Sequence, residues 1–196
     1  MPKRKYNIVI KKKGKKYYHI KLCGLVRDLP LFEVAPGIRI AIFNILGDTE
    51  IVKKTASALA RKLPKNADCA DCLVTPEVKS VPLAYELSRK IKIPYVVTRK
   101  IKKPYMLGSL GYKVVSITTG KPQTIWLDGK DKKKLKNKKV ILVDDVVSTG
   151  STLKGLRGLM KKAGAKIIAE AAVFTEGDPA KWKEIITLGS LPVFVD

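Results

Sequence analysis

Val140-Ile141-Leu142-Val143-Asp144-Asp145-Val146-Val147-Ser148-Thr149-Gly150-Ser151-Thr152 is the stretch that decides the fold of this chain. Its first four residues are branched and apolar, which indicates a strand buried on both faces, as in a parallel sheet. Two carboxylates follow where that strand ends. A turn of hydroxyl-bearing residues and glycine then leads into a helix, whose apolar positions Leu153, Leu156 and Met160 recur at three- and four-residue steps.

The chemistry of this stretch suits a phosphorylated sugar. The free N–H groups and the dipole at a helix start hold a phosphate group. Asp144 and Asp145 can accept hydrogen bonds from vicinal hydroxyls one sugar-length away. A solvated loop with a helix cap is the plainer alternative, since Asp, Ser and Thr all cap helices well. That alternative does not explain the acidic pair, the glycine and the buried strand together. A Walker-type loop and a dinucleotide fingerprint are absent.

Length and hydropathy indicate a globular protein. The 196 residues, 45% of them hydrophobic, suit one domain with a small accessory lobe. No apolar run approaches the roughly 18 residues needed to span a bilayer. The basic start, Met1 to Lys5, lacks the apolar stretch of a secretory signal. We therefore expect a cytoplasmic protein without membrane contact.

The net charge of +23 suggests a nucleic-acid partner, but its composition favours another interpretation. Arg accounts for seven of the 40 basic residues, which leaves 33 Lys. Readers of DNA sequence favour Arg forks, whereas Lys-rich surfaces are commonly just solvated. We therefore expect no specific nucleic-acid partner. Attraction of a polyanionic substrate is a second interpretation of the charge.

Cysteine and histidine are sparse. Cys69 and Cys72 form a lone Cys-x-x-Cys, Cys23 is distant, and His19 is the single histidine. No second pair completes a zinc site, so we expect no metal bound by these residues. Cys72 leads into an apolar run and is expected to be a buried thiol.

Hydrophobic periodicity divides the chain into two parts. Residues 5–22 predict a β-hairpin around a Lys-Lys-Gly-Lys-Lys turn, and 38–45 predict a further strand. A helix is expected from Gly47-Asp48 to Pro64. From about residue 70, strands and helices alternate, which predicts a mainly parallel sheet with helices on both faces. Ligands bind at the carboxyl ends of such strands. The strands expected in this part are 72–75, 95–98, 114–117, 124–127 and 167–174, with an irregular loop over 99–112.

The stretch 140–152 resembles the thirteen-residue signature of the type I phosphoribosyltransferases, which bind 5-phosphoribosyl-1-pyrophosphate (PRPP). The resemblance extends over roughly residues 40 to 196. It implies the type I phosphoribosyltransferase fold: a mainly parallel twisted sheet flanked by helices, with a hood subdomain built from both ends of the chain. We therefore expect an N-terminal hairpin and hood extension over 1–40 and a phosphoribosyltransferase domain over 41–196.

Three further segments match the family, and the last of them, residues 172–177 with 191–194, resembles the base-binding edge of the purine enzymes. In the family, the segment matching 75–84 holds the pyrophosphate of PRPP with backbone amides. Arg99-Lys100 resembles the pair that opens the mobile loop in adenine and xanthine phosphoribosyltransferases, and two cations there would neutralise the departing pyrophosphate. Asp144, Asp145 and Lys100 are the catalytic candidates. The resemblance implies these PRPP-binding residues: Glu77, Val78, Lys79, Ser80, Arg99, Lys100, Asp144, Asp145, Val146, Val147, Ser148, Thr149, Gly150, Ser151 and Thr152.

The base and the proton acceptor are less well defined. Phe174 and Val146 are the candidate base-binding residues, with a core position as the equal alternative for Phe174. Hypoxanthine and guanine enzymes usually place a Lys in this base-binding edge to bond the 6-oxo group, where this chain has an apolar residue. They also have an Asp at the position of Ser148, which acts as general base. Residues 99–123 also lack the loop Glu of the adenine enzymes. A backbone carbonyl, a water or Asp145 remains as the acceptor.

The resemblance implies a purine phosphoribosyltransferase of nucleotide salvage, acting with Mg²⁺ as a homodimer on PRPP and a purine base. Adenine is the favoured base, because the Lys and the Asp of the 6-oxopurine enzymes are missing. A xanthine or a hypoxanthine/guanine enzyme is the alternative. A different class, a non-catalytic PRPP-sensing transcription regulator, is disfavoured because residues 1–40 predict a hairpin instead of a winged helix. An RNA-binding pyrimidine-operon regulator lacks its matching segments.

Overall fold

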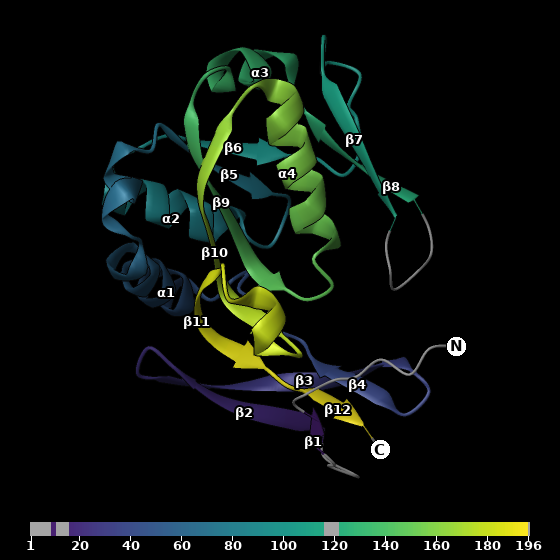
Figure 1. Ribbon diagram of the computed structural model, residues 1–196. Coiled ribbons are helices and arrows are strands. Elements are labelled where there is room, and N and C mark those ends of the chain that lie inside the picture. Colours follow the sequence, from purple (N-terminus) through teal and green to yellow (C-terminus); the bar gives the residue numbers. More distant parts are fainter. Residues whose placement is uncertain (1–8, 11–15, 116–121, 196) are drawn as a thin grey trace.

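A computed structural model describes residues 9–10, 16–115 and 122–195. Its centre is a five-stranded sheet in the order β11-β10-β9-β5-β6, in which every neighbouring pair is parallel (Figure 1). The bounds of these strands are β5 Cys72–Pro76, β6 Tyr95–Thr98, β9 Lys139–Val147, β10 Lys166–Glu176 and β11 Ile186–Leu191. The mainly parallel sheet predicted from the alternation of elements is confirmed, and all carboxyl ends meet at one edge.

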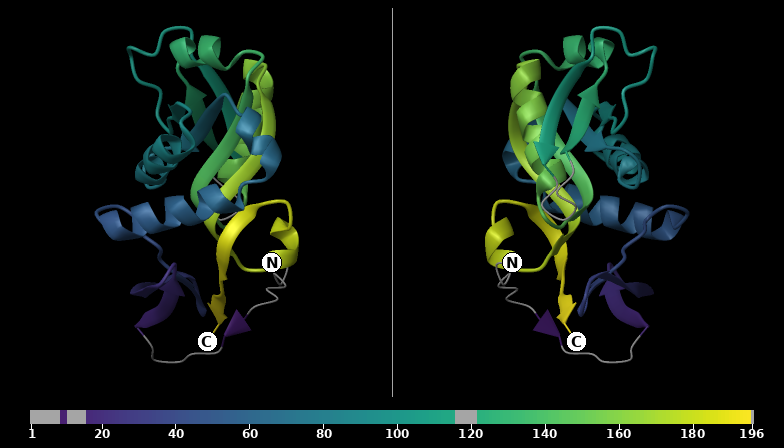
Figure 2. Two further views of the ribbon diagram at one scale, coloured as in Figure 1. Left: turned by 90° about the vertical axis from the view of Figure 1, so that its left-hand side faces the viewer. Right: turned by 90° about the vertical axis from the view of Figure 1, so that its right-hand side faces the viewer.

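Strand β9 is buried on both faces. Successive side chains of a strand point to opposite sides, and Val140 and Leu142 accordingly join one apolar cluster while Ile141 and Val143 join the other. Helix α4 (Ser151–Ala163) belongs to the first cluster, and α1 (Thr49–Lys62) and α2 (Val81–Ile91) belong to the second. The four consecutive branched residues are therefore required because both faces of the sheet are covered by helices (Figure 2).

The remaining elements of the core complete these layers. Strands β7 (Leu110–Val115) and β8 (Pro122–Leu127) form an antiparallel ribbon that packs on α4. Helix α3 (Gly129–Leu135) precedes β9, and two short 3₁₀ turns span Lys65–Cys69 and Pro179–Trp182. The strands expected over 95–98 and 124–127 are confirmed as β6 and β8. The strand expected over 114–117 begins earlier, at Leu110, within the segment expected to be an irregular loop, and residues 116–117 lie outside the described residues.

The hood is a second five-stranded sheet in the order β1-β12-β4-β3-β2, below the carboxyl edge of the central sheet (Figures 1 and 2). Its strands are β1 Val9–Ile10, β2 Tyr17–Leu22, β3 Leu25–Ala35, β4 Ile38–Ala41 and β12 Val193–Val195. The hood therefore unites both ends of the chain. The domain boundary expected at residue 40 falls inside β4. Strand β12, from the C-terminal end of the chain, belongs to the same sheet as the N-terminal strands.

The hairpin predicted over residues 5–22 is wrong in its pairing. Strand β2 pairs with β3 through a two-residue turn, Cys23-Gly24, while β1 runs parallel to β12. Both turn residues have positive φ, 52° and 80°, the conformation that matches the twist of a tight hairpin. The lysine-rich segment taken as the turn, and most of the expected first strand, lie outside the described residues.

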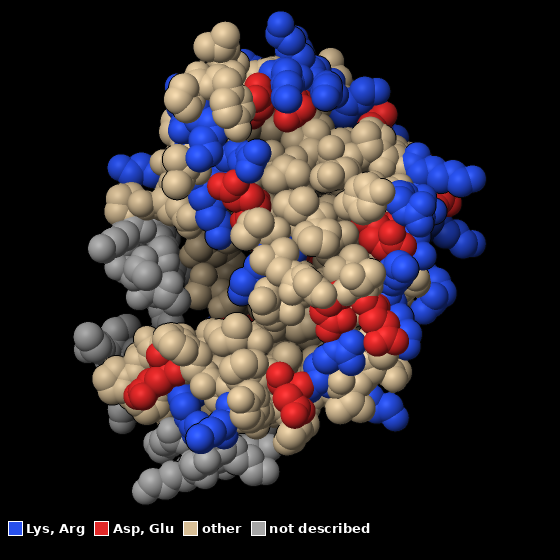
Figure 3. Space-filling view, turned by 180° about the vertical axis from the view of Figure 1, so that it is seen from behind, with Lys and Arg blue, Asp and Glu red and all other residues tan. Residues whose placement is uncertain are grey.

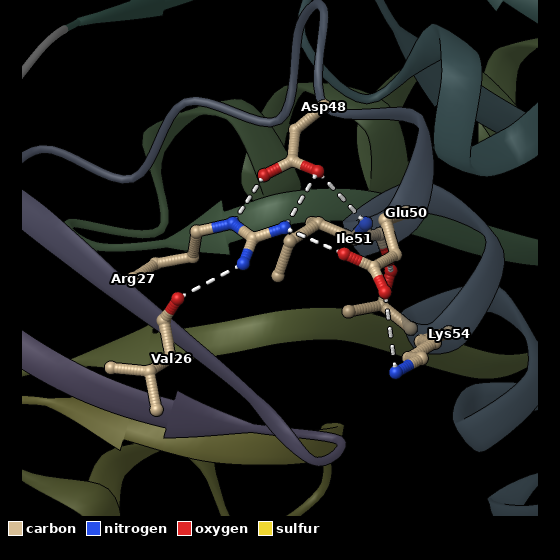
Figure 4. A network of polar contacts seen from close by, with 7 residues as sticks. Val26, Arg27, Asp48, Glu50, Ile51 and Lys54 are labelled. Carbon is tan, nitrogen blue, oxygen red and sulfur yellow. Dashed lines mark hydrogen bonds and ion pairs between the residues drawn. The ribbon is translucent and has the colours of Figure 1, made fainter.

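An ion-pair network joins the hood to the core. Arg27 of β3 donates from Nε and Nη2 to the carboxylate of Asp48, at 2.6 and 3.2 Å, and from Nη2 to Glu50 at 3.2 Å (Figure 4). Asp48 is also the N-cap of α1, accepting from the amide of Ile51 at 3.0 Å. The start of α1 and the hood strand are therefore held by one carboxylate.

The charged residues of the face seen in Figure 3 do not gather in a single basic stripe. On the face seen in Figure 3, Lys and Arg are spread around the margin with acidic residues between them, and the centre is mostly uncharged. This distribution is typical of a solvated, Lys-rich surface. Within the described ranges, no helix is long and apolar enough to cross a membrane.

Candidate active site

A cleft of about 320 Å³ lies between the carboxyl edge of the central sheet and the hood. This volume is within the usual range of small-molecule sites. The walls come from the ends of β5, β6, β9 and β10 and from the segment that contains β4. The residues that line it are Ile40, Ala41, Ile42, Phe43, Pro76, Glu77, Val78, Lys79, Ser80, Lys100, Asp144, Asp145, Val146, Ser148, Thr152 and Glu176.

Asp144 and Asp145 form the floor of the cleft. Both are buried, at 7% and 9% exposure, and the amide of Asp145 donates to Asp144 Oδ1 at 2.9 Å. Burial, and next the adjacent Asp145 carboxylate, raise the pKa of Asp144 well above its ordinary value. Negative charge that is so poorly solvated favours hydroxyl donors, a cation or a developing positive charge in the cleft.

Helix α4 begins a few residues after the acidic pair. Gly150 is the N-cap, with φ 76°, and no side chain caps the helix. The amide of Ser151 makes a long bond to the Thr149 hydroxyl at 3.4 Å, and the N–H groups that follow it in the first turn of α4 are available to an anion. The dipole of the helix adds to the attraction. A Cβ on Gly150 would approach the ring of Trp182 to 2.6 Å, so only glycine fits both the backbone angle and the space.

A second helix start lies beside the cleft. Strand β5 ends at Pro76, the loop 77–80 follows, and α2 begins after Ser80 without a side-chain cap. Ser80 is 1% exposed, and its hydroxyl donates to the carbonyl of Pro76 and accepts from Thr75, each at 2.9 Å. The serine is thus used to fix the loop. At the helix start itself, the amide of Val81 donates to the carbonyl of Val78 at 3.3 Å and Pro82 has no N–H, so an anion on this side would bind mainly to the backbone of the loop.

The two cations predicted at the end of β6 have different positions. Lys100 lines the cleft, but Arg99 donates from Nη1 to Glu77 at 2.9 Å. The backbone amide of Lys100 donates to the same carboxylate at 2.7 Å. Although burial opposes it, these two donors lower the pKa of Glu77. Glu77 thus ties the end of β6 to the loop after β5, and in this state Arg99 faces a carboxylate.

The hood supplies an apolar wall. Phe43 lines the cleft, and Phe174, 5% exposed, packs edge-on behind it with ring centroids 5.0 Å apart. Phe174 itself does not line the cleft. Its predicted contact with a base is not supported by this position, and Phe43, which follows β4, is the ring that faces the cleft. Val146, the second predicted base contact, does reach the cleft.

Glu176 is a polar wall residue that sequence reasoning missed. It ends β10, lines the cleft, and accepts a hydrogen bond from the Ser148 hydroxyl at 2.6 Å. Burial raises the pKa of Glu176, and the bond from Ser148 opposes that shift. The signal available in the sequence was an acidic residue at the carboxyl end of a strand, just after the apolar run Ala171–Phe174.

Most of the predicted PRPP-binding residues line the cleft together, and the others do not line it. Val147 is buried in the apolar core under α4, and the loop residues Thr149 and Ser151 hydrogen-bond to each other through their hydroxyls at 3.0 Å. The predicted residues that do not line the cleft are Arg99, Val147, Thr149, Gly150, Ser151 and Phe174. The lining residues that were not predicted are Ile40, Ala41, Ile42, Phe43, Pro76 and Glu176.

A parallel sheet with an acidic pair between two uncapped helix starts defines a phosphoribosyltransferase, and residues 44–189 match the family model of the phosphoribosyl transferase domain. The chain belongs to this family. It is 33% identical to the adenine phosphoribosyltransferase of Petrotoga mobilis over 152 residues, which are 73% of this chain and 79% of that one. It is 38% identical to the hypoxanthine/guanine phosphoribosyltransferase of Methanocella paludicola over 119 residues, 60% of this chain and 58% of that one.

The fold is also that of solved structures. The crystal structure of the adenine phosphoribosyltransferase from Thermoanaerobacter pseudethanolicus matches with a TM-score of 0.66. The two chains are 21% identical, and the match covers 83% of this chain and 95% of the other. The type I phosphoribosyltransferase fold expected from the signature is confirmed.

Proposed function

We propose that this protein is a purine phosphoribosyltransferase that transfers ribose 5-phosphate from PRPP to adenine, forming AMP and pyrophosphate with inversion at C1′. The observation that carries the proposal is the pair of buried carboxylates between two uncapped helix starts. PRPP has the same order of groups: a 5′-phosphate, a ribose diol and a pyrophosphate. Adenine is supported by the named activity of the Petrotoga relative.

The chain offers a defined role for each part of PRPP. The amides after Gly150 hold the 5′-phosphate, and Asp144 and Asp145 accept hydrogen bonds from the ribose hydroxyls. The backbone amides of the loop 78–80, with Lys79 and Lys100 on the cleft wall, hold the pyrophosphate. As the bond from C1′ to pyrophosphate lengthens, positive charge develops on the sugar above the two carboxylates, which stabilise it.

The acidic pair also suits Mg²⁺, which prefers one or two carboxylates together with substrate phosphate oxygens. Among the described residues, no cluster of three or more His, Cys, Asp or Glu side chains is placed to hold a metal by itself. Asp144 and Asp145 would therefore hold the ion together with PRPP oxygens. When bound, it would neutralise charge on the departing pyrophosphate.

Residues 101–107 support a proposed homodimer. Ile101, Tyr105 and Leu107 are 65%, 66% and 80% exposed, respectively, and follow the Arg99-Lys100 pair. Apolar side chains in such a position favour cover by a closed loop or by a second copy. Light scattering on the active protein at assay concentration tests this, and a monomeric mass with full activity would refute it.

The proposed activity is tested by incubating the protein with PRPP, Mg²⁺ and adenine, hypoxanthine, guanine or xanthine in turn, and separating the nucleotides. We expect AMP and pyrophosphate in equal amounts with adenine. If nucleotide forms only with a 6-oxopurine, the proposed substrate becomes hypoxanthine or guanine, as in the name of the Methanocella relative. No nucleotide with any purine, despite tight PRPP binding, would favour a non-catalytic PRPP sensor.

A further inference from the structure

The carboxyl of Glu176 lies on the side of the cleft from which the base must approach. The sheet order β11-β10-β9-β5-β6 places the end of β10 on one side of the acidic pair and the end of β5 on the other. Displacement with inversion needs the incoming base and the departing pyrophosphate on opposite faces of C1′. Since the pyrophosphate lies over the loop after β5, the base enters on the side of β10 and the hood.

This side of the cleft is otherwise apolar. Phe43 and Val146 line it, with the hood residues 40–42. The other titratable groups on the cleft wall belong to the pyrophosphate side or to the acidic pair: Glu77, Lys79, Lys100, Asp144 and Asp145. Glu176 is therefore the charged side chain that a planar base meets among the described cleft residues. The ring of the base would be held between apolar surfaces, while the edge of the base faces the carboxylate of Glu176.

Ser148 fixes the orientation of that carboxylate. Its hydroxyl donates to one oxygen, Oε1, at 2.6 Å, and no Lys or Arg within the described part of the chain forms an ion pair with Glu176. The backbone carbonyl of the same residue accepts from the Trp182 indole at 3.3 Å. One carboxylate oxygen is thus engaged, and the other remains available as an acceptor for a ligand.

We propose that Glu176 is a specificity-determining residue that selects a 6-aminopurine over a 6-oxopurine. This inference rests on the proposed function. A carboxylate only accepts hydrogen bonds, so it pairs with the exocyclic amino group of adenine. The oxygen at the same position of hypoxanthine is itself an acceptor, and two facing acceptors leave a buried polar group unpaired, which costs affinity.

The test is the kcat/KM of each purine at saturating PRPP for the wild type and for Glu176→Gln. Glutamine keeps the size of the side chain but adds an N–H donor, which bonds to a 6-oxo group. We expect kcat/KM for adenine to fall about 10- to 100-fold and that for hypoxanthine to rise, so that their ratio shifts by about 100-fold or more. Glu176→Asp keeps the charge and should keep the preference for adenine.

Two controls make the result decisive. Glu184→Gln is the same change at an exposed position outside the cleft, and it should leave both rates unchanged. The Kd for PRPP without base, measured by calorimetry, should be the same in Glu176→Gln as in the wild type, because the residue lies opposite the pyrophosphate.

Three results distinguish the failures. An unchanged ratio of adenine to hypoxanthine in Glu176→Gln would overturn the inference and leave the proposed function intact. Lost PRPP binding in that variant would assign Glu176 to the phosphate loop through Ser148, which also overturns it. A wild type that makes no purine nucleotide, yet binds PRPP, would overturn the proposed function itself.

Discussion

The carboxylate of Asp48 has two separable roles, and three variants separate them. It caps α1 through the amide of Ile51 at 3.0 Å and binds Arg27 of the hood at 2.6 and 3.2 Å. Asp48→Asn keeps a capping side chain but loses the charge, since Asn caps nearly as well as Asp. Asp48→Ala loses both roles. Arg27→Met keeps the apolar stem of the arginine and loses only the charged head.

The magnitude follows from the geometry. The side chains of Arg27 and Asp48 are 32% and 26% exposed, so their pair is worth more than a fully exposed ion pair and less than a buried one. We take about 1.5 kcal/mol for the pair, between the two ranges, and about 1 kcal/mol for the cap. Asp48→Asn and Arg27→Met should therefore each cost about 1.5 kcal/mol, and Asp48→Ala about 2.5 kcal/mol.

Urea unfolding at pH 7 measures these values through the shift of the midpoint at constant m. In thermal melts the Asp48→Ala variant should lose about 5–10 °C, given roughly 2–4 °C per kcal/mol for a chain of this size. The double variant Arg27→Met with Asp48→Asn should cost less than the sum of the two single changes, because both remove the same pair.

The same pair predicts a pH dependence. The hydrogen bond from Arg27 is the main cause that lowers the pKa of Asp48. Burial opposes this shift, and the bond from the Ile51 amide adds to it. A lowered folded-state pKa contributes stability that is present above the ordinary carboxyl pKa of about 3.9. It is lost as the pH falls through the folded-state value. The stability difference between wild type and Arg27→Met should therefore shrink as the pH falls below about 4.

Equal losses in Asp48→Asn and Asp48→Ala would show that the cap contributes nothing. An Arg27→Met variant as stable as the wild type would refute the hood-to-core link drawn in Figure 4.

Two further variants test the cleft. Gly150→Ala introduces a Cβ 2.6 Å from the Trp182 ring at φ 76°, so the loop must shift and PRPP affinity by calorimetry should fall about tenfold or more. Its matched control is Gly164→Ala, at φ 74° with its nearest neighbour at 3.8 Å, which should lower stability by about 1 kcal/mol and leave PRPP affinity unchanged. Phe43→Leu should raise the KM for adenine about fivefold through lost stacking, with the Kd for PRPP unaltered. Phe174→Leu, one layer deeper, should lower the melting temperature instead, and equal effects of the two Phe changes on KM would contradict the assignment of the wall.

The local pattern of the chain was sufficient for the central layer. Residues 140–143 are apolar without a break, and such a run is stable only where both faces of a strand are covered. The turn 148–150 and the apolar spacing after it define the start of α4. These features depend on neighbours within a few residues, so the sequence carries them directly.

The hood was less predictable because its pairings are not local. A lysine-rich segment and Cys23-Gly24 are both turn candidates, and only the register of β2 against β3 chooses between them. Strand β1 finds its partner in β12, at the opposite end of the chain. Short strands such as these pair by tertiary packing, which a local pattern does not encode.

The sequence by itself determined the family, the acidic pair and the two helix starts beside it. Tertiary structure decided which side chains line the cleft. Phe43 reaches the cleft, whereas Phe174 packs edge-on against it and does not. Ser148 and Glu176 are 28 residues apart and become neighbours only through the parallel pairing of β9 and β10. The proposed choice of substrate therefore depends on a contact between two strands, which no local stretch of the chain contains.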